Sequence, residues 1–162
     1  MTEKSRLFRD ALGHFATGVA IVTARGVDGA ALGLTINSFA SVSLDPPLVL
    51  WSLDRASDRF ATLMKAGHFC VNILGDEHRA LSQRLSRKGE SALDAGEVRE
   101  GVERLPILKT AIAHFECRVE HRHDGGDHVI FVGRVVDFGH KAHGNPLVYY
   151  RGRYRALNEA DH

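Results

Sequence analysis

Short polar side chains interrupt an otherwise apolar, strand-like segment between Thr35 and Ser43. This segment carries four hydroxyls and one amide, on Thr35, Asn37, Ser38, Ser41 and Ser43. Polar groups in such a setting need hydrogen-bond partners, so they either pair with solvent and neighbouring backbone or bind a ligand. The ligand that suits them is a flat polar heterocycle, whose carbonyl and N–H rim matches short side chains, with Phe39 or Trp51 covering its apolar parts. Both interpretations stay open on the residues alone.

Histidines form the second group able to carry chemistry, and the chain has ten of them. His121, His123 and His128 flank one predicted turn, and the first two share a strand face because strand side chains alternate. No cysteine pair or acidic pattern supplies a third ligand, so we predict no metal site. His128 instead follows Gly126 and Asp127. A glycine there permits a tight turn, from which an imidazole can donate to a carboxamide or a phosphate.

The two cysteines, Cys70 and Cys117, lie in separate apolar runs without the paired spacing of a zinc or iron–sulfur site. We interpret both as small buried hydrophobic residues, because neither has the basic neighbour or helix start that activates a thiol. A chain of 162 residues can also build its core without disulfides. These features fit a reduced, cytoplasmic protein.

Several function classes are excluded by charge and by missing motifs. The chain has 21 Lys and Arg against 20 Asp and Glu, which argues against a mainly electrostatic grip on nucleic acid or membrane. There is no GxGxxG after a strand, Walker loop, HExxH or GxSxG motif. No apolar stretch reaches the roughly 18 residues of a membrane span, and the polar start lacks the apolar region of a signal peptide.

The elements that must position the polar residues are mostly strands. The periodicity predicts an N-terminal helix at Ser5–Phe15, and Asp28-Gly29 predicts a hairpin turn between strands Gly18–Ala24 and Ala30–Ser43. Further strands are expected at Leu48–Leu53, Phe69–Leu74, Ala113–Glu120, Val129–Val136 and Pro146–Tyr150, with short helices at Ser57–Lys65 and Ala80–Leu85. This content predicts a mainly β protein, an antiparallel barrel or sandwich with peripheral helices, in a single domain spanning 1–162.

Two segments of this plan bear on later results. In the strand at Ala113–Glu120 the alternation predicts Cys117 and Val119 facing inward, with Glu116 and Arg118 facing the other way. The polar, charged stretch from Arg87 to Arg104 is expected to be a surface excursion and a candidate lid over a ligand.

The segments Thr17–Thr23 (TGVAIVT) and Gly33–Val49 (GLTINSFASVSLDPPLV) resemble the short-chain flavin reductase family. Phe69–Leu74, the triplet Gly126-Asp127-His128 and the closing strand Pro146–Tyr150 follow in the family's order. The resemblance runs from about Phe8 to Tyr154, the expected core of the domain, and its long second segment is far more specific than a short motif.

The resemblance implies an antiparallel split β-barrel of the FMN-binding type, usually a homodimer. It implies an enzyme that binds FMN or FAD and reduces it with NADH or NADPH, passing hydride from nicotinamide C4 to flavin N5. In many members the reduced flavin serves a separate monooxygenase. The small-molecule partners expected are therefore a flavin and a reduced nicotinamide, with no nucleic acid and no membrane.

Site residues follow from the same resemblance, position by position. The cofactor-binding set, for flavin and nicotinamide together, would be Thr35, Ile36, Asn37, Ser38, Ser41, Val42, Ser43, Ser52, Leu53, Ser57, Ser86, Arg87, Lys88, Asp127, His128 and Tyr150. His128 would also position the nicotinamide. Ser57, at a helix start, fits a phosphate contact or a plain N-cap, and sequence does not separate the two roles.

Two other functions remain open at this stage. The chain could be a non-catalytic flavin-binding barrel, because one architecture hosts several functions, although the Gly126-Asp127-His128 triplet argues against this. It could also reduce another flavin-linked substrate, such as a corrinoid, which no residue here demands.

Overall fold

The computed structural model describes residues 2–157, and they form a mainly β fold with a few short helices. The α-helices and strands in chain order are α1 Glu3–Leu12, β1 Thr17–Gly18, β2 Ala20–Arg25, β3 Ala31–Ile36, β4 Ala40–Leu44, β5 Pro47–Asp54, α2 Phe60–Lys65, β6 His68–Ile73, α3 Arg79–Leu85, β7 Val98–Glu100, β8 Pro106–Leu108, β9 Ala113–Gly125, β10 His128–His140, β11 Val148–Tyr150 and β12 Arg153–Arg155. Two 3-10 turns, Asp76–His78 and Val102–Arg104, complete them.

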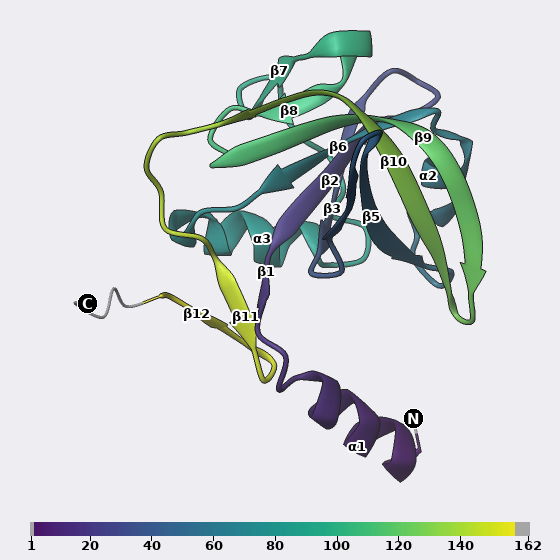
Figure 1. Ribbon diagram of the computed structural model, residues 1–162, viewed down its shortest axis with the longest axis vertical. Helices are drawn as coiled ribbons and strands as arrows, with labels where there is room; N and C mark the ends of the chain where they lie inside the picture. Colours follow the sequence, from purple (N-terminus) through teal and green to yellow (C-terminus); the bar gives the residue numbers. More distant parts are fainter. Residues whose placement is uncertain (1, 158–162) are drawn as a thin grey trace.

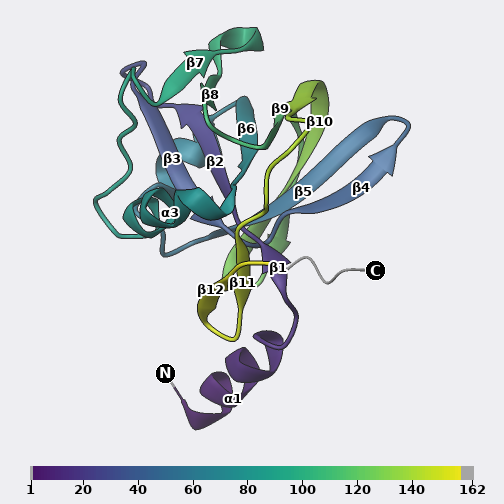
Figure 2. The same ribbon diagram turned by 90° about the vertical axis from the view of Figure 1, so that its left-hand side faces the viewer.

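A seven-stranded antiparallel sheet forms the body of the molecule, in the order β3-β2-β6-β9-β10-β5-β4 (Figure 1). A small sheet of β1, β11 and β12 lies at one end, next to α1. The two-stranded ribbon β7–β8 lies at the opposite end. In Figure 2 the β4–β5 hairpin reaches away from the rest of the strands.

The core is built on the inward faces of the central strands. Trp51 stacks on Phe131, with ring centroids 4.7 Å apart, and meets the edge of Phe69 at 5.7 Å. All three side chains are fully or almost fully buried, and each such aromatic removes a large apolar area from water. A second cluster, which includes Ile21 and Leu85, lies under α3.

Most of the expected elements are present in the structure. The N-terminal helix, the strand at Leu48–Leu53 and the Asp28-Gly29 turn are confirmed, with Gly29 at a φ of 79°. The helix expected from Ser57 begins later, at Phe60, while the Ser57 hydroxyl accepts a hydrogen bond from Arg59 N at 3.2 Å. Along residues 2–157 no helix is long and apolar enough to cross a membrane.

The single return strand expected over Ala30–Ser43 is wrong. The chain instead forms β3 and β4, separated by a bend at residues 37–39. The reason lies in the pairing, because β3 pairs with β2 at one edge of the sheet and β4 pairs with β5 at the other edge. The polar segment therefore crosses from one side of the sheet to the other, and only its first half lies beside β2.

Glu116 points to the face that the alternation predicts, but the expectation that this face is open to solvent is wrong. Its side chain does alternate with Cys117, but it is only 1% exposed. A Cβ built on Gly101 would lie 2.2 Å from Glu116 Oε2, so the segment after β7 packs directly against the carboxylate. A second layer of chain covers a sheet face that simple alternation would leave to solvent.

Candidate functional site

The candidate site begins where β3 ends and the chain bends. Thr35 Oγ1 donates to the carbonyl of Ser82 at 2.8 Å, and Ser38 Oγ accepts from Ser52 N at 3.0 Å. These two hydroxyls therefore hold α3 and β5 in place around the bend. Between them, Asn37 lines three cavities, of about 780, 230 and 200 Å³.

The smallest of these, the β5 cavity, lies between the end of β3, the end of β5 and the tip of the β9–β10 hairpin. Its wall brings together seven residues expected in the site, Thr35, Ile36, Asn37, Ser38, Ser52, Ser57 and His128, with Leu34 and Asp54. This wall offers hydroxyl, amide, carboxylate and imidazole groups around a small space.

The second cavity, the α3 cavity, lies on the other side of the same bend. It is lined by Val19, Thr35, Ile36, Asn37, Ser86, Tyr149 and Tyr154. Tyr154 OH shares a hydrogen bond of 2.7 Å with Ser82 Oγ, which ties β12 to α3. Among the expected residues, this cavity adds Ser86.

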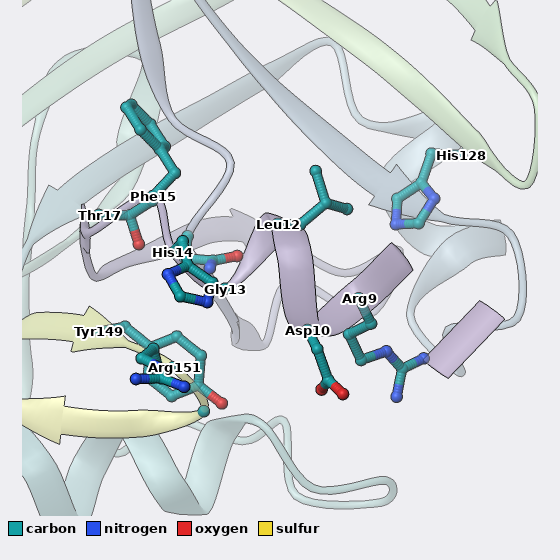
Figure 3. Close-up of a pocket in the computed structure, with 12 residues that line it drawn as sticks. Arg9, Asp10, Leu12, Gly13, His14, Phe15, Thr17, His128, Tyr149 and Arg151 are labelled. Carbon is teal, nitrogen blue, oxygen red and sulfur yellow. The ribbon is translucent and has the colours of Figure 1, made fainter. Parts of the chain in front are cut away.

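The largest space, the α1 cavity, lies between the C-terminal half of α1 and the β11–β12 turn (Figure 3). Its walls include Arg9, Asp10, His14, Thr17, Asn37, His128, Tyr149 and Arg151. Thr17 Oγ1 is buried and has no hydrogen-bond partner among the described residues. A volume of about 780 Å³ is in the range of small-molecule sites.

His128 is held at the tip of the β9–β10 hairpin. Its Nδ1 lies 2.7 Å from Asp127 Oδ1, and this hydrogen bond lowers the pKa of Asp127 below its ordinary value. An ionised carboxylate only accepts, so Nδ1 carries the proton and Nε2 remains for a ligand. Arg55 also holds the hairpin tip in place. Its backbone N–H donates to the Asp127 carbonyl at 2.9 Å, and its side-chain Nε donates to the Gly126 carbonyl at 3.1 Å.

A buried arginine that sequence reasoning missed organises the side of the site near Ser57. Arg59 is 5% exposed, and its Nη2 donates to the Arg87 carbonyl at 2.8 Å. Asp58 accepts from Gly89 N at 2.6 Å, which lowers the pKa of Asp58. These contacts fasten the stretch 86–89 beside Ser57. An arginine at this point of a predicted helix gives no sequence signal of burial.

Other expected residues lie away from these cavities. Ser41, Val42 and Ser43 are on the edge strand β4, and the side chain of Leu53 is fully buried in the core. The Tyr150 ring lies against His14, with centroids 6.4 Å apart, whereas its neighbour Tyr149 lines two of the cavities.

The remaining reactive residues do not form a site of their own. Within residues 2–157 no group of three or more His, Cys, Asp and Glu is placed to hold a metal ion. Cys70 and Cys117 are free and buried, and burial raises the pKa of both thiols, that of Cys117 to about 12. Neither thiol is therefore a nucleophile at neutral pH.

The residues present fit a flat heterocycle with a polar rim and a charged tail. The bend at Asn37 lies where three cavities adjoin, so a planar group bound in any of them would lie beside this side chain. Ser57 and Ser86 line two of these cavities, and they lie next to the two segments that Arg59 connects by its hydrogen bond to the Arg87 carbonyl. What this arrangement offers is hydrogen bonding and positioning, without a nucleophile or a carboxylate pair.

Comparisons with known proteins agree with this geometry. The model of the flavin reductase like domain matches residues 12–158. The FMN reductase (NADH) SmoA of Agrobacterium fabrum is 45% identical over 152 residues, covering 94% of this chain and 86% of that protein. A longer relative in Rhizobium meliloti is 42% identical over 149 residues, and the chain spans only 48% of its length.

A solved structure gives the same picture. The NADH:FAD oxidoreductase SgcE6 of Streptomyces globisporus, in complex with NAD and FAD fragments, superposes with a TM-score of 0.89 at 31% identity. The match covers 99% of this chain and 98% of that one.

Proposed function

Because the chain belongs to the flavin reductase-like domain family, we propose that the residues around Asn37 and His128 are where it reduces a flavin with NADH or NADPH. The chain is an NAD(P)H-dependent flavin reductase. The observation that carries the placement is that Asn37 borders three cavities at once, with His128 on two of them. Hydride transfer needs two planar rings held about 3–3.5 Å apart. The two rings would therefore meet where the α1 and β5 cavities adjoin, at Asn37 and His128.

The flavin, FMN or FAD, would be bound along the end of β3. Thr35, Ile36, Asn37, Ser38, Ser52 and Ser57 would surround it from the β5 cavity, and Ser86, Arg87 and Lys88 would meet its phosphate side. When bound, the flavin supplies the hydride acceptor. The chain's own contribution is hydrogen bonding to the ring and exclusion of water.

His128 would position the nicotinamide. Asp127 holds a proton on Nδ1, so Nε2 is left to form a hydrogen bond with the carboxamide. The Arg55 contacts to residues 126 and 127 keep the imidazole at the mouth of both cavities. This is a positioning role, because the hydride moves between the two cofactors.

We also propose a homodimer in which the sheet closes as a split β-barrel. Helix α1 has no buried residue and extends away from the body in Figure 1. Its apolar residues Leu7, Phe8 and Leu12, together with Phe15, are 58–78% exposed. Leu44, at the end of β4, is 95% exposed. Exposed apolar side chains on this scale mark an interaction surface, and a second copy can cover the same patch on both chains.

The dimer has a direct test. Light scattering at micromolar concentration should give twice the mass of the 17.8 kDa chain. Phe8→Glu should shift the mass toward the monomer, whereas Lys4→Glu, on the same helix, should not. A monomer with full reductase activity would remove the dimer from the proposal.

The relatives of this chain indicate its cellular setting. Reductases related to this chain include the reductase subunit HsaB of a flavin-dependent monooxygenase in Rhodococcus jostii, 38% identical over 152 residues. We therefore propose that this chain supplies reduced flavin to a separate monooxygenase. The free, buried cysteines support a reducing, cytoplasmic location. A single domain over 1–162 is supported by the family match, which runs from residue 12 to residue 158.

Steady-state assays test the function. Purified protein should oxidise NADH or NADPH when FMN, FAD or riboflavin is added, with a saturable dependence on both substrates. A protein that binds flavin without oxidising either nicotinamide would be the non-catalytic barrel. Activity that depends on an added corrinoid, and not on free flavin, would support that alternative.

A further inference from the structure

The turn between β11 and β12 holds an arginine in a conformation that suits other residues better. Arg151 has a φ of 50° and Gly152 a φ of 74°, so both central residues of the turn lie in the left-handed region. Two-residue hairpin turns of this kind favour Asn or Asp before Gly, because those short side chains tolerate positive φ. A long side chain is uncommon at such a position, which suggests a function for the guanidinium group of Arg151.

The turn is fixed by its contact with the end of α1. Arg151 N donates to the carbonyl of Gly13 at 2.9 Å. A Cβ on Gly13 would come within 3.4 Å of Arg151 Cα, so the two backbones meet closely. The strand residues on either side, Tyr150 and Arg153, pair with each other. The position of Arg151 is therefore set by α1 and by the β11–β12 hairpin together.

The same residue lies on the wall of the α1 cavity. In Figure 3, Arg151 and His14 lie at one side of the view, and Arg9 and His128 at the other. Two arginines face one acidic residue, Asp10, on these walls, so the lining is positive even with neutral histidines. Thr17 Oγ1, buried without a partner among the described residues, adds one polar group able to donate a hydrogen bond.

We propose that Arg151 is a specificity-determining residue that binds the phosphates of the reduced nicotinamide dinucleotide in the α1 cavity. The inference rests on the proposed function, in which His128 receives the nicotinamide end. A guanidinium suits this role because its planar fork can donate two parallel hydrogen bonds to phosphate oxygens. The cavity is large enough for both ends, since it reaches from His128 to Arg151 within about 780 Å³.

The variant Arg151→Asn tests this with little risk to the fold. Asparagine before glycine is a favoured pair for this turn, so the variant keeps the backbone while removing the guanidinium. KM for NADH and the Kd for ADP-ribose measured by calorimetry should both rise roughly ten- to a hundredfold, as expected for lost hydrogen bonds to a charged group. The kcat, the flavin affinity and the melting temperature should stay close to wild type.

A substrate without phosphates separates this role from others. 1-Benzyl-1,4-dihydronicotinamide carries the reacting ring but no phosphate, so Arg151→Asn should oxidise it, with flavin as the hydride acceptor, at the wild-type rate. Arg153→Asn removes the same charge two positions further along, at a residue that does not line the cavity, and is the matched control. Arg151→Lys should restore part of the NADH affinity, since it keeps the charge without the fork.

Each other outcome overturns the inference. An unchanged KM for NADH and Kd for ADP-ribose, an equal loss with both hydride donors, or a change of molecular mass in place of a change in KM would each do so. Reductase activity in the wild type combined with a normal Arg151→Asn variant would remove only this inference. A wild type that oxidises no nicotinamide would instead remove the proposed function, and with it this extension.

Discussion

The two ends of the central sheet use the same kinds of polar residue in opposite ways. Under the β7–β8 ribbon, Asn72 donates to Ile21 O and Thr23 Oγ1, each at 3.0 Å, and accepts from Leu108 N at 2.9 Å. Thr23 Oγ1 in turn donates to the Pro106 carbonyl. At the other end, Asn37 lies at the meeting point of three cavities.

The hydrogen bonds that each side chain makes within the chain distinguish a structural polar residue from one that is available to a ligand. Asn72 is fully buried, and both ends of its amide are used by the chain itself. Thr35 and Ser38 are intermediate, because their hydroxyls bond to neighbouring backbone while the residues still line a cavity. A polar side chain in a strand is free for function only where no second layer of chain has taken its hydrogen bonds.

Removing the hydrogen bonds of Asn72, at the end of the sheet covered by the β7–β8 ribbon, should have the largest effect. Asn72→Ala leaves Leu108 N buried without its acceptor and removes both donor bonds, so we expect a loss of about 2–4 kcal/mol in the free energy of unfolding. Urea denaturation followed by circular dichroism measures it. Asn37→Ala is the matched control at the open end and should leave the urea midpoint nearly unchanged. Equal midpoints for the two variants would contradict the contrast.

At the other end of the sheet, where Asn37 and His128 line the cavities, His128→Ala should lower catalytic efficiency and leave stability unchanged. Loss of one hydrogen bond to the nicotinamide, worth about 1–3 kcal/mol, should lower kcat/KM for reduced nicotinamide by roughly one to two tenfold steps. Flavin affinity and melting temperature should remain at wild-type values. Asp127→Asn, which retains a hydrogen-bonding side chain beside Nδ1, should have a smaller effect on the same ratio. Joint loss of stability and flavin binding would mark His128 as structural.

Flavin affinity should fall at both Asn37 and Ser38, and stability should separate the two residues. Each substitution to alanine should weaken flavin affinity by about 0.5–1.5 kcal/mol for a neutral hydrogen bond. Ser38→Ala should also lower stability, since Ser52 N loses its partner, whereas Asn37→Ala should not. Titration of the apoprotein with FMN and FAD, with melting curves alongside, gives both quantities. Unchanged affinity in both variants would place the flavin elsewhere.

The smallest effect is expected at Glu116, and it depends on pH. Burial raises the pKa of this carboxyl, opposed by the backbone of Val102 and by the charge of Arg99, while Asp137 raises it further and His114 lies nearby. The native state therefore binds this proton more tightly than the unfolded chain, so unfolding free energy falls as pH rises above the ordinary value of 4.5 through the raised one.

Glu116→Gln removes that fall. The variant should match wild type in acid and melt slightly higher at neutral pH, by roughly 2–4 °C for each kcal/mol gained. Glu120→Gln, on the same strand and paired with Arg134, is the control and should show no such gain. A wild type more stable than Glu116→Gln at neutral pH would mean that the ionised carboxylate is well satisfied in the fold.

The sequence predicted the parts of this molecule that depend on local pattern. The strands at Leu48–Leu53 and Phe69–Leu74 and the N-terminal helix follow from periodicity, and the Thr35–Ser38 stretch was expected at the site. The division of Ala30–Ser43 into β3 and β4 was not readable, because it depends on which strands each half pairs with. Composition does not change at the bend.

Features that depend on a second layer of chain packed over the sheet could not be predicted from the sequence either. Glu116 looks solvent-facing by alternation, and it is buried only because the polar excursion folds back as β7 and β8. Arg59 is buried because it bonds to the backbone of Arg87, 28 positions away. Such long-range contacts leave no periodic trace in the sequence, so it indicated residues that line the cavities but not the contacts that hold those residues in place.

The position of Asn37 on all three cavities has a consequence for the order of binding. Two ligands that both contact this one side chain cannot have independent affinities, because the first to arrive fixes the rotamer that the second meets. Thermodynamic linkage makes the coupling equal in both directions, so whatever factor flavin adds to dinucleotide affinity, the dinucleotide returns to flavin. The flavin affinity measured with and without the dinucleotide would then report the state of a single amide.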